Sequence, residues 1–199
     1  MPDRQTPEHK TRLRHDFRER RRRLDAAVRA DADRRICETL LDLSCVSPGA
    51  RLAAYWPFDG EPDLRPALET LHRRGTRVCL PIVPQQAGAG LEMHAWTPGS
   101  EIHNGRLGQG EPAAGDVVAV QDLDIVLLPL VAWDRAGARL GMGAGYYDRY
   151  LAPVAGHLSP LRIGIAYAAQ EAKSLPADPW DVPLHGLVCE HGWIEFEAI

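Results

Sequence analysis

The first part of the chain places apolar and charged residues at the spacing of amphipathic helices. Leu13, Phe17 and Leu24 recur after four and seven residues, which puts them on one narrow stripe of a helix. Thr6-Pro7-Glu8 supplies a capping hydroxyl, a proline and an early carboxylate, so we expect this helix to begin there. Another of its faces carries the arginines Arg14, Arg18 and Arg21.

A second helix is predicted from Asp25, which can cap its first turn, to about Leu43. Pro48-Gly49 closes this helical region because neither residue continues a helix readily. The side chains predicted to face inward are Val28, Ile36, Leu40 and Leu43.

From residue 51 the pattern changes to short apolar runs separated by turn residues and helical segments, which is typical of β-α-β units. Strands are predicted at residues 52–56, 78–83, 91–96, 124–129, 162–167 and 187–190. One helix follows Asp63 and ends at Gly75, and a short one covers residues 146–151. A turn-rich connection is predicted at 85–90 and an irregular stretch at 97–115.

The most apolar run, residues 124–129, indicates a central strand covered on both faces. We therefore expect an α/β fold, a three-layer sandwich with a mainly parallel central sheet and the basic N-terminal helix packed on it. No clear linker divides the chain, so residues 1–199 are expected to form a single domain. Ligands of such sheets gather beyond the carboxyl ends of the strands.

The composition is that of an ordinary globular protein, with 45% hydrophobic and 25% charged residues. No apolar run is long enough to span a membrane and no signal-like segment is visible, so we expect a cytoplasmic protein. The four cysteines lie far apart and predict neither a zinc site nor disulfides. The net charge of −4 hides an asymmetry, because residues 1–35 carry +5. We expect something anionic near this basic end.

The segment Arg139–Arg149, RLGMGAGYYDR, carries the strongest functional signal. Its three alternating glycines let the backbone approach a ligand closely and present bare N–H groups to phosphate oxygens. The flanking cations and Asp148 are residue types that hold a polyphosphate and its divalent metal. Because the spacing matches neither the dinucleotide fingerprint nor the P-loop, we predict a nucleotide phosphate site of another kind.

Three further segments each allow a structural and a functional interpretation. Residues 56–61, WPFDGE, are either an aromatic corner with a solvated acid or a wall against which a flat heterocycle stacks while Glu61 accepts its N–H groups. Trp180-Asp181 is either structural or supplies an acid to a metal shell begun by Asp148. Arg20–Arg23 is a solvated helix face, a nucleic-acid arm or a contact to nucleotide phosphates.

With its surroundings, the glycine segment resembles a known signature. Pro129–Asp134 followed by Gly137–Arg149 is similar to that of the 5-formyltetrahydrofolate cyclo-ligases, also called methenyltetrahydrofolate synthetases, in their bacterial branch. The resemblance extends over nearly the whole chain, including residues 58–61 and Leu175-Pro176 before Trp180-Asp181. It implies an enzyme that uses ATP and Mg²⁺ to convert 5-formyltetrahydrofolate to 5,10-methenyltetrahydrofolate, releasing ADP and phosphate. A phosphorylated formyl group, an iminophosphate, is the implied intermediate.

By position, the resemblance also implies roles for individual residues. ATP would be bound by Lys10, Arg14, Arg139, Leu140, Gly141, Met142, Gly143, Ala144, Gly145, Tyr146 and Tyr147. The folate would be bound by Trp56, Glu61, Met142, Gly143, Ala144, Gly145 and Tyr146. Asp148 and Asp181 would hold Mg²⁺, directly or through water, and the catalytic residues would be Arg139, Tyr146 and Asp148.

Two loop positions depart from the family pattern. Met142 stands where some relatives have a basic residue, and Ala144 where others have glycine or lysine, so less charge reaches the transferred phosphate from the loop. The register of the basic helix is also open, with Arg18 or Arg20 as alternatives to Arg14 in contact with ATP.

Two other functions stay open on sequence alone. One is a noncatalytic module that binds RNA through the arginine run, and the other is a relative that acts on another formylated or pterin-like amide. The remaining chain is acidic and lacks the aromatics of a single-strand platform. We therefore expect small-molecule substrates and a monomer, with neither a membrane nor a nucleic acid as partner.

Overall fold

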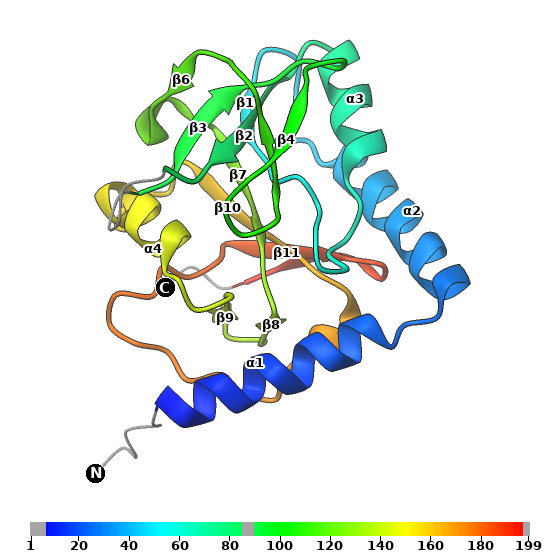
Figure 1. Ribbon diagram of the computed structural model, residues 1–199, viewed down its shortest axis with the longest axis vertical. Coiled ribbons are helices and arrows are strands. Elements are labelled where there is room, and N and C mark those ends of the chain that lie inside the picture. The colour runs from blue at the N-terminus through cyan, green and yellow to red at the C-terminus, as the bar shows by residue number, and fades with distance from the viewer. Residues whose placement is uncertain (1–6, 85–89, 197–199) are drawn as a thin grey trace.

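An eight-stranded sheet lies at the centre of the computed structural model, which describes residues 7–84 and 90–196 (Figure 1). Its strands follow the order β12-β11-β10-β7-β1-β2-β3-β6. The parallel strands are β1 (Arg51–Ala53), β2 (Arg77–Ile82), β7 (Ile125–Pro129), β10 (Leu161–Ile165) and β11 (Gly186–Cys189). Antiparallel strands complete the two edges: β3 (Glu92–Ala95), β6 (Val117–Val118) and β12 (Gly192–Glu195). The sheet is therefore mainly parallel, as predicted.

The central strand β7 is buried on both faces because its side chains alternate between two cores. Ile125 and Leu127 belong to the core on one face, and Val126 and Leu128 to the core on the other. β7 pairs in parallel with β1 on one side and with β10 on the other. The predicted central, doubly covered strand is thereby confirmed.

Helices cover both faces of the sheet (Figure 1). The helices α2 (Ala26–Asp42) and α3 (Arg65–Arg73) pack on one face, and the short helix α4 (Tyr146–Leu151) packs on the other. Asp25 caps α2 as predicted, and its carboxylate accepts a hydrogen bond of 2.8 Å from the backbone N–H of Ala27. The predicted three-layer α/β sandwich is confirmed.

Two details of these helices differ from the prediction. Val28 is 57% exposed, so its predicted inward position is wrong, and the buried stripe of α2 begins one turn later at Ala32. Asp63 accepts a hydrogen bond from the backbone N–H of Arg65, but the N-cap position of α3 is occupied by Leu64. Among the described residues, no helix is both long and apolar enough to cross a membrane.

The basic helix α1 (Pro7–Arg22) crosses one end of the molecule (Figure 1). It contacts β8 (Ala132–Trp133) and the 3₁₀ turn η3 (Ala168–Gln170), and its Phe17 is buried in a cluster with Leu140. Because β8 follows the carboxyl end of β7 and η3 follows that of β10, α1 packs at the end of the sheet where ligands bind.

The sequence missed several short strands. Residues 97–115, predicted as irregular, contain a hairpin of β4 (Ile102–Asn104) and β5 (Gly110–Pro112). A second small hairpin pairs β8 with β9 (Arg139–Leu140), and the edge strand β12 was also not predicted. Strands of two to four residues are too short to show a period. Residues 85–89 of the predicted connection, and Thr6 at the predicted helix start, lie outside the described residues.

Candidate active site

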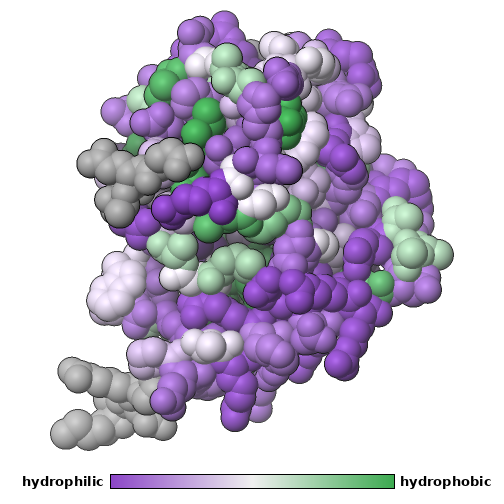
Figure 2. Space-filling view, viewed as in Figure 1, coloured by the Kyte–Doolittle hydropathy of each residue, from purple (hydrophilic) through white to green (hydrophobic). Residues whose placement is uncertain are grey.

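A cavity of about 680 Å³ opens at the end of the sheet that α1 crosses. Figure 2 shows the hollow in the middle of this face, with apolar side chains around it and hydrophilic surface below. Five parts of the chain line it: α1, the turn at residues 58–61, the β4–β5 hairpin, the glycine loop at 141–145 and the segment at 178–181.

Every residue that the sequence assigned to the site lines this single cavity. They are Lys10, Arg14, Trp56, Glu61, Arg139, Leu140, Gly141, Met142, Gly143, Ala144, Gly145, Tyr146, Tyr147, Asp148 and Asp181. Arg18 and Arg20, the alternatives to Arg14, are not among its lining residues: Arg18 binds Asp59, and Arg20 lies over the ring of Phe17. The geometry therefore favours Arg14 as the arginine of α1 that faces the site.

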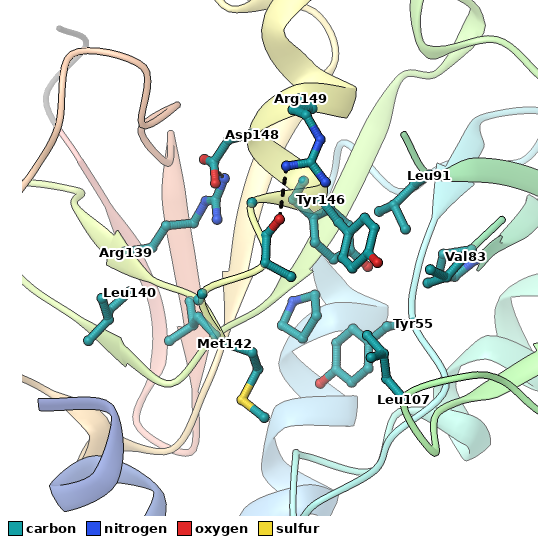
Figure 3. A pocket seen from close by; sticks show the side chains of 18 of the residues that line it. Tyr55, Val83, Leu91, Leu107, Arg139, Leu140, Met142, Tyr146, Asp148 and Arg149 are labelled. Carbon is teal, nitrogen blue, oxygen red and sulfur yellow. Dashed lines mark hydrogen bonds and ion pairs between the residues drawn. The ribbon is translucent and has the colours of Figure 1, made fainter. Parts of the chain in front are cut away.

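The glycine loop turns sharply between β9 and α4, with its tip exposed in the cavity (Figure 3). Gly143 and Gly145 have positive φ angles of +101° and +66°, which are backbone conformations that residues with a Cβ rarely adopt. A Cβ at Gly143 would lie 3.1 Å from Cζ of Arg14, and Nε of Arg14 donates a 2.9 Å hydrogen bond to the carbonyl of Gly141. The loop needs glycine both for its turn and for this close approach of α1.

Arg139 and Asp148 form an ion pair at the base of the loop (Figure 3). Nη2 of Arg139 lies 2.5 Å from Oδ1 of Asp148, and the Arg139 side chain is only 5% exposed. Nε of Arg139 is also buried and has no hydrogen-bond partner in the described part of the chain. The pair therefore fixes the Arg139 guanidinium at the base of the loop and engages only its Nη2 among the five N–H donors.

A second ionic group joins α1 to the segment at 178–181. Nζ of Lys10 lies 2.7 Å from Asp178 and 3.0 Å from Asp181, and Asp181 also accepts the backbone N–H of Asp178 at 2.8 Å. Burial acts to lower the pKa of Lys10, but the two carboxylates outweigh this effect and raise it. Lys10 is therefore a fixed cation at the cavity wall. Sequence reasoning missed Asp178, although its position three residues before Asp181 was a usable signal.

Asp148 and Asp181 fit the binding of a divalent cation that is shared with phosphate oxygens. Each carboxylate has one oxygen without a hydrogen-bond partner among residues 7–84 and 90–196, Oδ2 in Asp148 and Oδ1 in Asp181. Magnesium commonly takes one or two protein carboxylates and fills its shell with water and phosphate oxygens. Residues 7–84 and 90–196 contain no group of three or more His, Cys, Asp or Glu side chains that could hold a metal without other ligands.

Three arginines of α1 converge on Asp59. Arg18 and Arg21 contact Oδ2 at 2.9 and 3.0 Å, and Nε of Arg22 contacts Oδ1 at 3.0 Å. Arg21 is only 1% exposed and also donates to the carbonyls of Asp59 and Leu130. The interpretation of residues 20–23 as a solvated face is therefore wrong at Arg21, whereas Arg20, Arg22 and Arg23 are exposed. The turn acid Asp59 is not solvated, because its side chain is only 12% exposed. We call this group the Asp59 cluster.

Glu61 is buried two residues after Asp59, with 6% of its surface exposed. Its Oε2 accepts a 3.3 Å hydrogen bond from the backbone N–H of Phe58. Burial raises the pKa of Glu61 to about 7, against the opposing effects of the Arg21 guanidinium and the Phe58 N–H. A carboxyl group in a cavity wall with a pKa near neutral pH can change its protonation state when a ligand binds.

The β4–β5 hairpin covers the aromatic wall. A Cβ at Gly110 would lie 2.2 Å from the Trp56 ring, which itself lies 6.1 Å from the Trp96 ring. The apolar lining that sequence reasoning missed comes largely from residues on separate strands and on this hairpin, including Tyr55, Pro81, Val83, Leu91 and Leu107. No local pattern distinguishes such residues from ordinary core positions.

The model of the 5-formyltetrahydrofolate cyclo-ligase family matches residues 6–190. The chain belongs to this family. The match covers all five segments that line the cavity, and it confirms the family resemblance seen in the glycine segment.

Curated and solved relatives agree with this assignment. The 5-formyltetrahydrofolate cyclo-ligase of Escherichia coli K12 is 35% identical over 174 residues, which cover 86% of this chain and 95% of that protein. The NMR structure of 5,10-methenyltetrahydrofolate synthetase from Aquifex aeolicus has a TM-score of 0.80 and 31% identity, covering 96% of this chain and 94% of that one. The Mycoplasma pneumoniae synthetase has a TM-score of 0.73 at 25% identity, with coverages of 91% and 98%.

Replacing Asp59 by Asn should destabilise the protein by about 3 kcal/mol, because the buried guanidinium of Arg21 loses its counter-charge. Asparagine tolerates the positive φ of 51° at this position, so the substitution mainly removes charge. Urea unfolding measures the change. Asp31→Asn is the matched control, since Asp31 pairs with Arg34 and Arg35 on the surface and should matter little. Equal effects of the two substitutions would show that the Asp59 cluster stabilises the fold no more than a surface ion pair does.

The raised pKa of Glu61 predicts a pH dependence of stability. The ordinary pKa of a glutamate is 4.5, and that of Glu61 in the folded protein is about 7. Between pH 4.5 and about pH 7, Glu61 therefore keeps a proton in the folded protein that it has lost in the unfolded chain. The free energy of unfolding should therefore fall as the pH rises through this interval, by about 3 kcal/mol at most. Glu61→Gln should remove that fall, whereas Glu69→Gln, at an exposed carboxylate of α3, should retain it. Urea midpoints at pH 5 and pH 8 give the comparison, and identical pH profiles for all three proteins would contradict it.

Proposed function

We propose that the protein catalyses the Mg²⁺-dependent, ATP-driven cyclisation of 5-formyltetrahydrofolate to 5,10-methenyltetrahydrofolate, with release of ADP and phosphate. The family and the names of its relatives support this ring closure. The observation that carries the proposal is that a nucleotide-type loop and an aromatic wall with a buried acid border the same cavity. All of these residues come from one chain, so we propose that a single-domain monomer is sufficient.

The proposed chemistry removes a poor leaving group. The formyl oxygen attacks the γ-phosphorus of ATP, and ADP leaves. N10 of the folate then attacks the formyl carbon of the iminophosphate, loses its proton, and phosphate departs as the N5–C–N10 bridge becomes the methenyl cation. Both steps need the two substrates in contact, so positioning and charge stabilisation are the main tasks of the protein.

We assign the nucleotide to the side of the cavity that α1 and the glycine loop form. Arg14 is held against Gly141 and has no carboxylate partner in the described part of the chain, so its remaining donors can contact phosphate. Arg139, which lines the cavity, contributes a guanidinium fixed at the base of the loop by Asp148. Backbone N–H groups of Leu140–Tyr147 supply further donors, as glycine-rich loops do for phosphates.

We assign the pterin ring to the side formed by Trp56 and Glu61. The buried carboxyl group of Glu61 would accept N–H groups of the ring in its ionised form, and the Trp56 indole provides an apolar face for the ring. Residues 142–146 belong to the loop that we assign to both ligands, and we propose that the formyl group binds beside them, at the junction of the two ligands. Tyr146 borders this junction and is the residue best placed to hold the reacting oxygen.

Asp148 and Asp181 would hold the magnesium ion, which neutralises phosphate charge when it arrives with ATP. The ion pairs of Asp148 with Arg139 and of Asp181 with Lys10 hold both carboxylates in position before the nucleotide binds. An RNA-binding role is disfavoured, because Arg18, Arg21 and Arg22 are engaged by Asp59.

The direct test mixes the purified protein with 5-formyltetrahydrofolate and MgATP. Methenyltetrahydrofolate absorbance should appear, with one ADP formed per turnover, and should require all three components. A parallel reaction with other formylated pterins measures the substrate preference. Absence of product from folded protein with every substrate would reject the proposed function.

The Asp148→Asn variant tests the assigned metal role. Turnover should fall by at least a hundredfold, roughly the loss of 3 kcal/mol of transition-state stabilisation. The buried Arg139 loses its counter-charge in this variant, so the melting temperature should also fall, and turnover is compared at a temperature at which both proteins are folded. Asp122→Asn, at an exposed carboxylate outside the cavity, serves as the matched control and should retain full activity. Equal activity of the two variants would remove Asp148 from the mechanism.

A further inference from the structure

Tyr146 is contacted by two guanidinium groups at the rim of the cavity. Nη2 of Arg106, in the turn of the β4–β5 hairpin, lies 2.5 Å from the Tyr146 hydroxyl. The guanidinium of Arg149 lies over the Tyr146 ring, 5.1 Å from its centroid, and Nη1 donates to the carbonyl of Ala144 at 2.8 Å (Figure 3). One tyrosine thus joins two cations from segments about forty residues apart in sequence.

Neither of these arginines pairs with a carboxylate among residues 7–84 and 90–196. Two other cations of the cavity wall differ in this respect, since Lys10 binds Asp178 and Asp181, and Arg139 binds Asp148. Arg14 also lacks a carboxylate partner among these residues, but it is held against the glycine loop by the carbonyl of Gly141. Arg106 and Arg149 are both exposed. Two adjacent cations without counter-charge, fixed by one aromatic ring, form a site for an anionic group.

The position of this pair separates it from the nucleotide side. Arg14 approaches Gly141 and Gly143 from α1, whereas Arg149, on α4, donates to the carbonyl of Ala144. Figure 1 shows the β4–β5 hairpin on the opposite side of β9 from α1. Arg106 therefore reaches Tyr146, a lining residue of the cavity, from the side that faces away from the basic helix.

Apolar side chains lie between the aromatic wall and this pair. Figure 3 shows Val83 and Leu91 on one side of Tyr146 and Leu107 next to Tyr55, and all of them line the cavity. Leu107 is adjacent to Arg106 in the same hairpin and is 49% exposed. An aromatic segment of a ligand that starts at Glu61 would lie along these residues, and an anionic end would reach the rim.

We infer that Arg106 and Arg149 bind the carboxylates of the glutamate tail of the folate, and that this rim contributes to the choice of substrate. The inference rests on the proposed function. A folate has a flat pterin, an aromatic benzoyl segment and an anionic glutamate, and the cavity presents matching surfaces in that order. Arg106 is the better residue to test, because the Arg149 contact with Ala144 also shapes the loop.

The experiment compares two ligands without ATP, so that binding is measured apart from turnover. Dissociation constants of 5-formyltetrahydrofolate and of 5-formyltetrahydropteroate, which lacks the glutamate, are measured by titration calorimetry. The wild-type protein should bind the glutamate-containing ligand more tightly. Arg106→Gln should raise the dissociation constant of the glutamate-containing ligand about threefold to tenfold and leave that of the pteroate unchanged. Added salt should reduce the difference between the two ligands.

Two variants control the result. Arg106→Lys keeps the charge and should retain much of the preference for the glutamate ligand. Arg77→Gln removes an exposed arginine at the opposite end of β2 and should behave as wild type. Melting temperatures establish that all variants are folded.

Equal weakening of both ligands by Arg106→Gln would show that Arg106 only positions Tyr146 and would overturn the inference. Weaker binding of MgADP with unchanged folate binding would assign the rim to phosphate and would overturn it as well. If wild-type protein binds both folates equally, the rim plays no part although the proposed function stands. If it binds neither, the proposed function and the inference both fail.

Discussion

The contact between α1 and Asp59 is the interaction on which the rest of the site depends. A helix as charged as α1 has a narrow apolar stripe, and only Phe17 and Arg21 are fully buried along it. Burying Arg21 is costly unless its charge is paired, and Asp59 supplies both a carboxylate and a carbonyl to its Nη2. Its buried Nε has no hydrogen-bond partner among the described residues. The same turn carries Glu61, so the contact that fixes α1 also fixes the buried acid.

This arrangement joins two sides of one cavity. Toward its N-terminus, α1 carries Arg14 to the glycine loop and Lys10 to the carboxylates at 178 and 181. Toward its C-terminus, it holds the turn that leads to Glu61. The ion pair between Arg139 and Asp148 fixes the other end of the loop. A cavity built in this way presents fixed charges before any substrate arrives, which lowers the cost of binding and reaction.

The sequence predicted the layers because they follow from local patterns. Apolar runs such as 124–129 are long enough to identify buried strands, and Asp25 is a capping residue with a clear position. The glycine segment was recognisable because it is contiguous. The convergence of Lys10 and Asp181, 171 residues apart, was expected from family resemblance and could not be derived from spacing.

What the sequence missed depends on tertiary contacts. The short hairpins β4–β5 and β8–β9 have no periodicity, yet they place Arg106 and Arg139. The arginine run looked like a solvated face, because its partner Asp59 lies 37 to 41 residues away in sequence. The raised pKa of Glu61 likewise arises from burial by distant segments.

A crystal structure with MgADP and 5-formyltetrahydrofolate bound together tests the central claim most directly. The account predicts both ligands in the one cavity, with the ADP phosphates against the glycine loop and Arg14, and the pterin against Trp56 and Glu61. The formyl oxygen should face the terminal phosphate of the nucleotide. A folate bound outside this cavity, or a nucleotide that does not contact α1, would contradict the account.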